Sequence, residues 1–310
     1  MINYYISEGT DMRPLDTCIP GCWVNVVCPN EHEITSLIDN FGLEPDFIRA
    51  ALDEEESSRI ETEDGNTLII IDIPFQETRE DGNVFTTMPL GIVVTESNVI
   101  TVSLRENHIV NEVAKGGAKG VNTALKTRFV LYLLLRISNR YMQFLKRIER
   151  MTSSLEKQLR DTMKNANLLQ MHDINKSLVY FSTSLKADEI TIEKLARGRF
   201  IKLYEEDQDL LEDVLIEFKQ AIEMNTIYSN VLSGTIDIFA SVISNNLNIV
   251  MKILASITIV ISIPTFITGF YGMNIGVDAI PFDNFWWAPL VISLVLMGGC
   301  AFWLHKKDML

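Results

Sequence analysis

The chain has 310 residues, of which 47% are hydrophobic, and a formal net charge of −14; this length suits one large domain or two of ordinary size. So acidic a chain is a poor candidate for binding nucleic acid, because a phosphate-binding face needs clustered Lys and Arg side chains. The few charges within residues 247–310 cancel, so the whole excess of acid lies in 1–246. The sequence therefore predicts a water-soluble acidic body joined to an almost uncharged C-terminal segment.

Residues 1–120 carry both strand and helix signals. Runs rich in β-branched residues and bounded by turn sequences predict strands. These runs are residues 22–28, 59–63, 67–73, 84–94 and 99–102. Apolar spacing predicts short helices at 32–41 and 45–52. We therefore expect an α+β domain over 1–120.

From residue 121 onward the sequence is helical in character almost to its end. Segments 121–164 and 168–195 are periodic with mixed charges, and predict an antiparallel pair of long helices within 121–204. A third helix is expected to begin near Glu205 and meets no proline before Pro264. At 1.5 Å per residue, some sixty residues make a helix of about 90 Å, far longer than a bilayer is thick. Residues 205–246 thus form a helical stalk that leads into a membrane helix.

Apolar residues recur along this stalk at steps of four, three and four. They are Leu232, Ile236, Phe239 and Ile243. This spacing predicts a seam that packs against another helix, either within the chain or in a second copy of it.

Two segments near the C-terminus are long and apolar enough to cross a membrane. Residues 253–270 and 285–304 contain no charged side chain, and each can span a hydrocarbon core of about 30 Å as a helix. We therefore expect a first transmembrane helix over 247–271 and a second over 285–304.

The charges beside these spans predict their orientation. Lys252 precedes the first span, while Lys306 and Lys307 follow the second. The connecting loop, 272–284, contains no Lys or Arg. By the positive-inside rule the acidic domain, both chain ends and the basic tail 305–310 are cytoplasmic, and the loop is extracytoplasmic.

The first span carries a stripe of small and hydroxylated residues at helical spacing. The stripe runs through Asn248, Met251, Ala255, Thr258, Ser262, Thr265 and Gly269. Such a face either permits close packing of two helices or, when several copies gather, lines a weakly polar pore. Spacing alone favours neither. Hydroxyl and amide oxygens in rings would suit Mg²⁺, which loses its inner water shell reluctantly.

The sequence Tyr271-Gly272-Met273-Asn274 ends the first span. Together with two terminal spans, a short acidic loop and a closing Lys-Lys-Asp-Met-Leu, it resembles the CorA family of magnesium transporters. The resemblance implies a funnel-shaped homopentamer in the cell (inner) membrane whose first span lines the pore. It also implies that Asn274 forms an outer ring for the hydrated ion, that Gly272 permits the turn, and that Tyr271 and Met273 brace the loop.

The same resemblance assigns roles further along the helix. Asn248 would form a lower polar ring, Met251 and Leu254 a hydrophobic gate, and Asp237 an acidic ring nearer the cytoplasm. The family's sensor for cytosolic Mg²⁺ would fall on Asp213, with Asp209 beside it. From the residues alone, a solvated helix face is the more common role of such carboxylates.

Two departures from the family pattern fall in the middle of the span. Pro264 is shifted by one residue, and Ser262 replaces a bulky apolar side chain. Both leave the width of that part of the pore undefined.

Three functions are compatible with this sequence. The first is Mg²⁺ influx gated by cytosolic Mg²⁺, and the second is transport of Zn²⁺, Co²⁺ or Ni²⁺ by the same architecture. The third is a membrane-anchored sensor or enzyme. Residues 1–246 contain neither a His-Glu-x-x-His nor a Gly-x-Ser-x-Gly signature, so we expect a transporter and not an enzyme.

Overall fold

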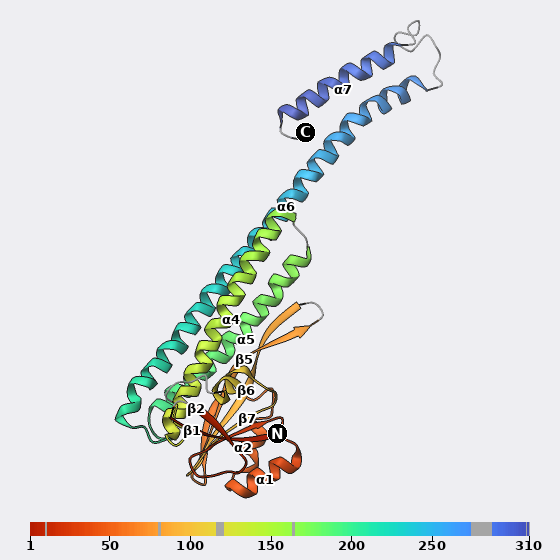
Figure 1. Cartoon of the computed structure of the whole chain (residues 1–310). Helices are drawn as coiled ribbons and strands as arrows, with labels where there is room; N and C mark the ends of the chain where they lie inside the picture. The colour runs from red at the N-terminus through yellow and green to blue at the C-terminus, as the bar shows by residue number, and fades with distance from the viewer. Residues whose placement is uncertain are drawn as a thin grey trace. The chain divides into compact units, whose positions relative to one another are not determined.

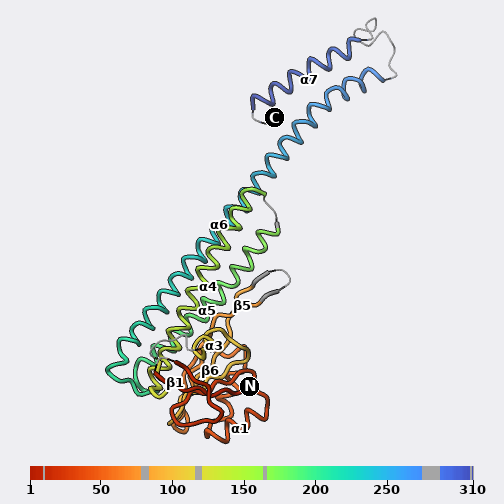
Figure 2. Tube along the Cα trace, in the orientation of Figure 1, coloured from red at the N-terminus to blue at the C-terminus, as the bar shows by residue number. Residues whose placement is uncertain are grey.

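The computed structural model describes residues 1–9, 11–79, 82–115, 121–162, 165–273, 287–307 and 309. It forms two compact units, Met1–Ile236 and Asp237–Leu310. The first unit contains a sheet and most of the helices, and the second contains two apolar helical segments (Figure 2).

A seven-stranded sheet organises the first unit, in the order β2-β1-β3-β7-β6-β5-β4. Its strands are β1 (Ile2–Glu8), β2 (Asp11–Leu15), β3 (Trp23–Val27), β4 (Arg59–Glu63), β5 (Asn66–Arg79), β6 (Gly82–Val94) and β7 (Val99–Ser103). Only β3 and β7 pair in parallel; every other neighbouring pair is antiparallel. All five strands expected from β-branched runs are confirmed, β4 with the bounds predicted.

Helices cover both faces of this sheet. They are α1 (Glu31–Phe41), α2 (Pro45–Ala50), α3 (His108–Ala114), α4 (Lys126–Thr162) and α5 (Asn165–Ala196). Because strand side chains alternate between faces, Leu68 and Ile70 join the core beneath α1 and α2. On the other face, the Trp23 ring lies 5.3 Å from that of Phe129 on α4, measured between centroids. Helices α4 and α5 run along this second face (Figure 1).

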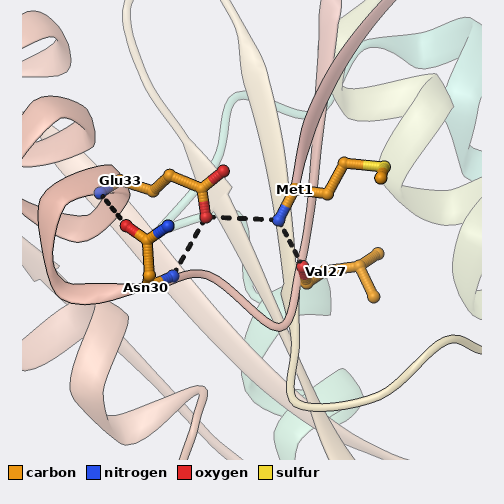
Figure 3. A network of polar contacts seen from close by, with 4 residues as sticks. All are labelled: Met1, Val27, Asn30 and Glu33. Atoms are coloured by element: carbon orange, nitrogen blue, oxygen red, sulfur yellow. Dashed lines mark hydrogen bonds and ion pairs between the residues drawn. The ribbon is translucent and has the colours of Figure 1, made fainter.

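The first turn of α1 is fixed by a reciprocal cap (Figure 3). The backbone N–H of Glu33 donates to Asn30 Oδ1 at 2.9 Å, and the Asn30 N–H donates to Glu33 Oε2 at 2.9 Å. The amino group of Met1 lies 3.2 Å from the same Glu33 oxygen and 2.7 Å from the Val27 carbonyl oxygen. The Asn30 N–H, aided by the Met1 ammonium, lowers the pKa of Glu33. This cap satisfies orphan backbone donors and ties the first residue to α1.

Polar contacts fix α5 on the sheet. Asp188 of α5 is fully buried, and its Oδ1 accepts from Ser58 Oγ at 2.6 Å and from the Asp72 backbone N–H at 2.9 Å. Ser184, one turn earlier, donates to Asp72 Oδ2 at 2.5 Å. The Tyr141 hydroxyl of α4 donates to the Asp72 carbonyl oxygen at 3.1 Å. Strand β5, α4 and α5 thus meet at one buried polar cluster.

The remaining helices follow the sequence expectations closely. A short 3-10 turn, η1 (Glu205–Asp207), precedes α6 (Gln208–Tyr271), and α7 (Ala288–Lys306) follows. The expected third helix is therefore a single element of 64 residues. Along the seam, Leu232 and Phe239 are 1% and 7% exposed, so the chain itself already covers these two residues, as the within-chain alternative requires.

Three elements of the first unit were not expected from local pattern. They are β1, β2 and α3. The second apolar helix also begins later than expected, at Ala288, and residues 285 and 286 lie outside the described residues.

Candidate functional site

Two helices are long and apolar enough to cross a membrane by length and composition. One comprises η1 and α6, and the other is α7. Only 6% of the most apolar 18-residue stretch of the first helix, and 17% of that of α7, is buried within the chain. The core helix of a soluble protein would be mostly covered, so these apolar surfaces need another medium or another chain.

One face of α6 within the second unit is covered by the chain itself. Ser256 and Ile267 are 0% and 9% exposed, and Val260 and Ile263 are half-buried between them. The Ser256 hydroxyl donates to the Met309 carbonyl oxygen at 2.8 Å, which ties this face to the segment after α7. The covered residues recur at steps of four, three and four, as expected for one side of a helix.

The small-residue stripe lies on a different side of α6. At about 100° per residue, its mean direction is roughly 140° from that of the covered face. Every member is exposed: Asn248, Met251, Ala255, Thr258, Ser262, Thr265 and Gly269. The contact that α6 makes within the chain therefore does not use the stripe.

The hydroxyl groups of the stripe share one hydrogen-bonding arrangement. Thr258 Oγ1 donates to the Leu254 carbonyl oxygen at 2.8 Å, and Ser262 Oγ donates to that of Ile259 at 2.7 Å. Thr265 Oγ1 donates to the Ile261 carbonyl oxygen at 3.2 Å. Each hydroxyl proton is thus engaged by the helix backbone, which leaves oxygen lone pairs facing outward. A row of acceptors suits the outward-pointing hydrogens of water around a cation.

The middle of the stripe is slightly hollowed. A shallow open depression there is lined by Thr258, Ser262 and Thr265, together with Ile261 and Phe266. The depression therefore presents the oxygen atoms of three hydroxyl groups whose protons the helix backbone engages.

The C-terminal end of α6 closes with a tight backbone turn. The Gly272 N–H donates to the Thr268 carbonyl oxygen at 2.9 Å, and a Cβ on Gly272 would lie 3.2 Å from that oxygen. The rings of Phe270 and Tyr271 meet edge to face with centroids 6.0 Å apart. Met273 is exposed. Asn274, the expected outer polar ring, lies outside the described residues.

The residues expected to form the gate and the lower rings are exposed along α6. Met251 and Leu254, the expected hydrophobic gate, are 56% and 57% exposed. Asn248 and Asp237, the expected polar and acidic rings, are exposed as well. In one chain these side chains have no common centre, because they lie one after another along a single helix.

The expected sensor carboxylates lie on α6 within the first unit. Asp209 and Asp213 are one turn apart and both exposed, whereas Leu211 and Val214 between and beside them are buried. Among the residues that the structure describes, no three His, Cys, Asp or Glu side chains converge on a point where a metal ion would fit. A metal held by these aspartates would need ligands from elsewhere.

Sequence reasoning missed one acidic residue of this region. Asp207 is 5% exposed and lies 3.8 Å from the Arg128 guanidinium of α4. The run of acidic residues around it gave no signal that only this one is buried.

Comparison with known sequences identifies the family. The chain matches the profile of the CorA-like Mg²⁺ transporter protein family over residues 21–306. It is 28% identical over 283 residues to the cobalt/magnesium transport protein CorA of Methanocaldococcus jannaschii, covering 89% of this chain and 87% of that protein. It is 20% identical over 313 residues to the protein of the same name from Thermotoga maritima, covering 97% of this chain and 88% of that one.

Solved structures give the same picture for the fold. The complete structure of the CorA magnesium transporter from Methanocaldococcus jannaschii matches with a TM-score of 0.82 at 24% identity, over 99% of this chain and 96% of that chain. The full-length CmaX protein matches with a TM-score of 0.72 at 19% identity, over 100% of this chain and 98% of that chain. Since the family profile covers nearly the whole sequence, the chain belongs to the CorA-like Mg²⁺ transporter family, a family of ion transporters and not of enzymes.

Proposed function

We propose that several copies of this chain form a channel that carries hydrated Mg²⁺ into the cytoplasm through a pore lined by α6. The observation that carries the proposal is the exposed stripe on α6, whose hydroxyl oxygens are free to accept while their protons are bound by the helix. One such stripe cannot enclose a pore, but copies arranged about an axis would each contribute one. A homopentamer is the arrangement that the family resemblance implies.

Neutral oxygen ligands favour a cation that keeps its water. Mg²⁺ holds its inner shell tightly, and contacts through that shell need acceptors but no carboxylate cage. The stripe offers such acceptors at Asn248, Thr258, Ser262 and Thr265. The Asn274 amide, at the outer end, would orient the hydrated ion as it enters.

The membrane arrangement follows from charge. Lys252, Lys306 and Lys307 flank the two spans on one side, so we place that side and the acidic first unit in the cytoplasm of a plasma (inner) membrane. The membrane potential then drives cation entry at about 2.3 kcal/mol per charge for each 100 mV.

Flux into liposomes tests the role of the stripe. Full-length protein would be reconstituted with a Mg²⁺-sensitive dye inside, and flux would be driven by a potential that is negative inside. Thr258→Val and Thr265→Val keep the side-chain shape but remove an acceptor, so each is expected to lower Mg²⁺ flux by up to about tenfold. Asn274→Ala is expected to lower it as well.

Thr268 provides the matched control. It is exposed on the same helix, and its hydroxyl donates to the Pro264 carbonyl oxygen at 2.9 Å, as the stripe hydroxyls do to theirs. It lies about 110° from the mean direction of the stripe. Thr268→Val should keep wild-type flux; an equal loss in all three threonine variants would show that the face of the helix is irrelevant and would refute the pore assignment.

Co²⁺ is the second candidate ion, because both curated relatives are named cobalt/magnesium transport proteins. The same liposomes would be assayed side by side with Mg²⁺, Co²⁺, Ni²⁺ and Zn²⁺. Zn²⁺ flux that follows a proton gradient, with no movement of Mg²⁺, would contradict the magnesium assignment.

A further inference from the structure

A cavity in the first unit is lined by hydrogen-bond donors that have no role in the proposed transport. It has a volume of about 370 Å³ and lies between β5, the segment before α3, and α4. Its lining includes Asn107, His108, Arg140 and Arg147. Volumes of about 300–1,000 Å³ are typical of small-molecule sites.

One donor beside this cavity has no partner. Asn107 is 6% exposed, and its Oδ1 accepts the Val110 N–H at 2.8 Å to cap α3. Its Nδ2 is buried and has no acceptor among the residues that the structure describes. A buried donor without an acceptor costs free energy, so such a group calls for a ligand, an ion or a water molecule.

Two arginines on α4 face the same space. Arg140 donates to Gln143 Oε1 at 2.9 Å, and its guanidinium lies 5.1 Å from the centre of the Phe144 ring. Arg147, two turns later, donates one N–H to Gln76 Oε1 at 2.5 Å. Each guanidinium has five N–H groups, so both keep donors for a further acceptor.

The charge around the cavity favours an anion. Arg140 lies 3.8 Å from Glu112, beyond hydrogen-bonding distance, and Glu106 is the one acidic residue in the lining. The lining thus has two guanidinium groups and one carboxylate; Glu112 offsets part of the Arg140 charge, whereas Arg147 has no ion pair among the residues that the structure describes. Arg140 has a side-chain exposure of 21%, so its attraction for an anion is screened less than at an open surface.

We propose that this cavity binds a small phosphorylated molecule, with its phosphate held by Arg140 and Arg147 beside the Asn107 side chain. A phosphate group offers several acceptor oxygens in a tetrahedral arrangement, which suits donors on two separate walls better than a flat carboxylate does. Phe75 and Phe144 also line the cavity and give the rest of the ligand an apolar wall. The site is separate from the proposed pore and does not depend on it.

Calorimetric titration of the full-length protein in detergent tests this site. The probes would be inorganic phosphate, ATP and citrate, with EDTA present so that no bound cation bridges the anion. Wild type is expected to bind ATP more tightly than inorganic phosphate, because the nucleoside also contacts the aromatic wall. Arg140→Gln and Arg147→Gln should each weaken ATP binding about tenfold.

Two further variants test whether the loss of binding is specific to this cavity. Asn107→Asp keeps the oxygen that caps α3 but adds a negative charge beside the phosphate, so it should abolish phosphate binding while circular dichroism stays unchanged. Arg150→Gln removes the same charge from an exposed position on α4 outside the lining and should change affinity less than twofold.

Three outcomes would overturn the proposal. They are no binding of either phosphate probe by wild type at millimolar concentration, an equal loss of affinity in Arg150→Gln and Arg140→Gln, and tighter binding of citrate than of both phosphate probes. Transport is not measured in this experiment, so a failed pore assignment would leave its result unaffected.

Discussion

At the scale of single residues, Asp188 stands out because its carboxyl group is fully buried and no basic side chain among the described residues pairs with it. Its Oδ1 accepts from Ser58 and from the Asp72 N–H, whereas its Oδ2 has no donor among the described residues. Burial, reinforced by the nearby Asp72 carboxylate, raises the pKa of Asp188 well above its usual range, and burial also raises the pKa of Asp72. The neutral acid is the form that this site favours.

Asp188→Asn is therefore expected to stabilise the protein at alkaline pH. An acid whose pKa is raised on folding contributes stability that is fully present below its unfolded pKa, about 3.9, and lost as the pH rises through its folded pKa. Asn stays neutral and keeps an oxygen for Ser58 and Asp72. At pH 8 we expect a gain of about 1 kcal/mol, or about 2–4 °C in Tm, and a weaker dependence of Tm on pH.

Thermal unfolding between pH 5 and pH 8 measures this effect. Glu189→Gln serves as the control, because Glu189 is the next residue of α5 and is only half-buried; it should leave the pH dependence as it is. A lower Tm for Asp188→Asn at pH 8 would mean that the charged carboxylate is favoured in the folded state.

Gly91 shows how closely an element can approach the sheet. It lies on β6, and a Cβ there would be 2.4 Å from the Cβ of Ala51, which follows α2 and is fully buried. Neither atom belongs to a flexible side chain, so α2 would have to move. Gly91→Ala is expected to destabilise the first unit by about 1–3 kcal/mol, measured by chemical denaturation.

Rescue distinguishes this clash from a general effect of the substitution. Ala51→Gly removes the opposing methyl group, so the double variant should recover part of the lost stability. If Ala51→Gly only adds to the loss, close approach is not the cause.

At the scale of elements, local pattern predicts some segments well and others not at all. β4 has the predicted bounds because it contains the β-branched residues Ile60 and Thr62 and because the turn sequence Glu63-Asp64-Gly65-Asn66 ends it. β2 contains Pro14 and two charged residues in five, a composition that is tolerated only because the strand lies at the edge of the sheet. The edge position of β2 cannot be predicted from its own residues, since it depends on pairing with β1.

The same contrast holds for the sites. The stripe on α6 can be recognised in the sequence because its residues recur at helical spacing. Only the three-dimensional structure shows that a different face of α6 is covered by the chain. The Arg140 and Arg147 cavity was not predicted. Those arginines are 33 and more residues from Asn107 in sequence, and only the packing of α4 beside α3 brings them together.

At the scale of the whole molecule, we propose that Asp213 and Asp209 take part in a sensor for internal Mg²⁺ at the contact between copies. Asp213 and Asp209 are exposed, so in an assembly a divalent cation can bridge them to carboxylates of a neighbouring copy and hold the subunits in a closed arrangement. Asp213→Ala, alone or with Asp209→Ala, is expected to weaken inhibition by internal Mg²⁺ by about tenfold in concentration. Mg²⁺ dependence of the current in excised patches measures it.

Glu212→Ala provides the control, because it removes one carboxylate from a different side of the same helix. Glu212 is exposed and adjacent to Asp213 but points about 100° away around α6. Glu212→Ala should keep the wild-type dependence on internal Mg²⁺. An unchanged dependence in Asp213→Ala would remove this residue from the sensor.

The polar cluster around Asp188 also restricts where α5 can rest on the sheet. If α5 slid by one turn in either direction, Ser184 or Ile192 would take the place of Asp188 opposite Ser58 and the Asp72 N–H. Ile192 offers no acceptor, and the shorter Ser184 offers one oxygen on a smaller side chain. An apolar surface would tolerate such a shift with little loss, whereas these hydrogen bonds allow one axial position. The buried acid thus specifies the alignment of the helix, even though its charged form costs the protein stability.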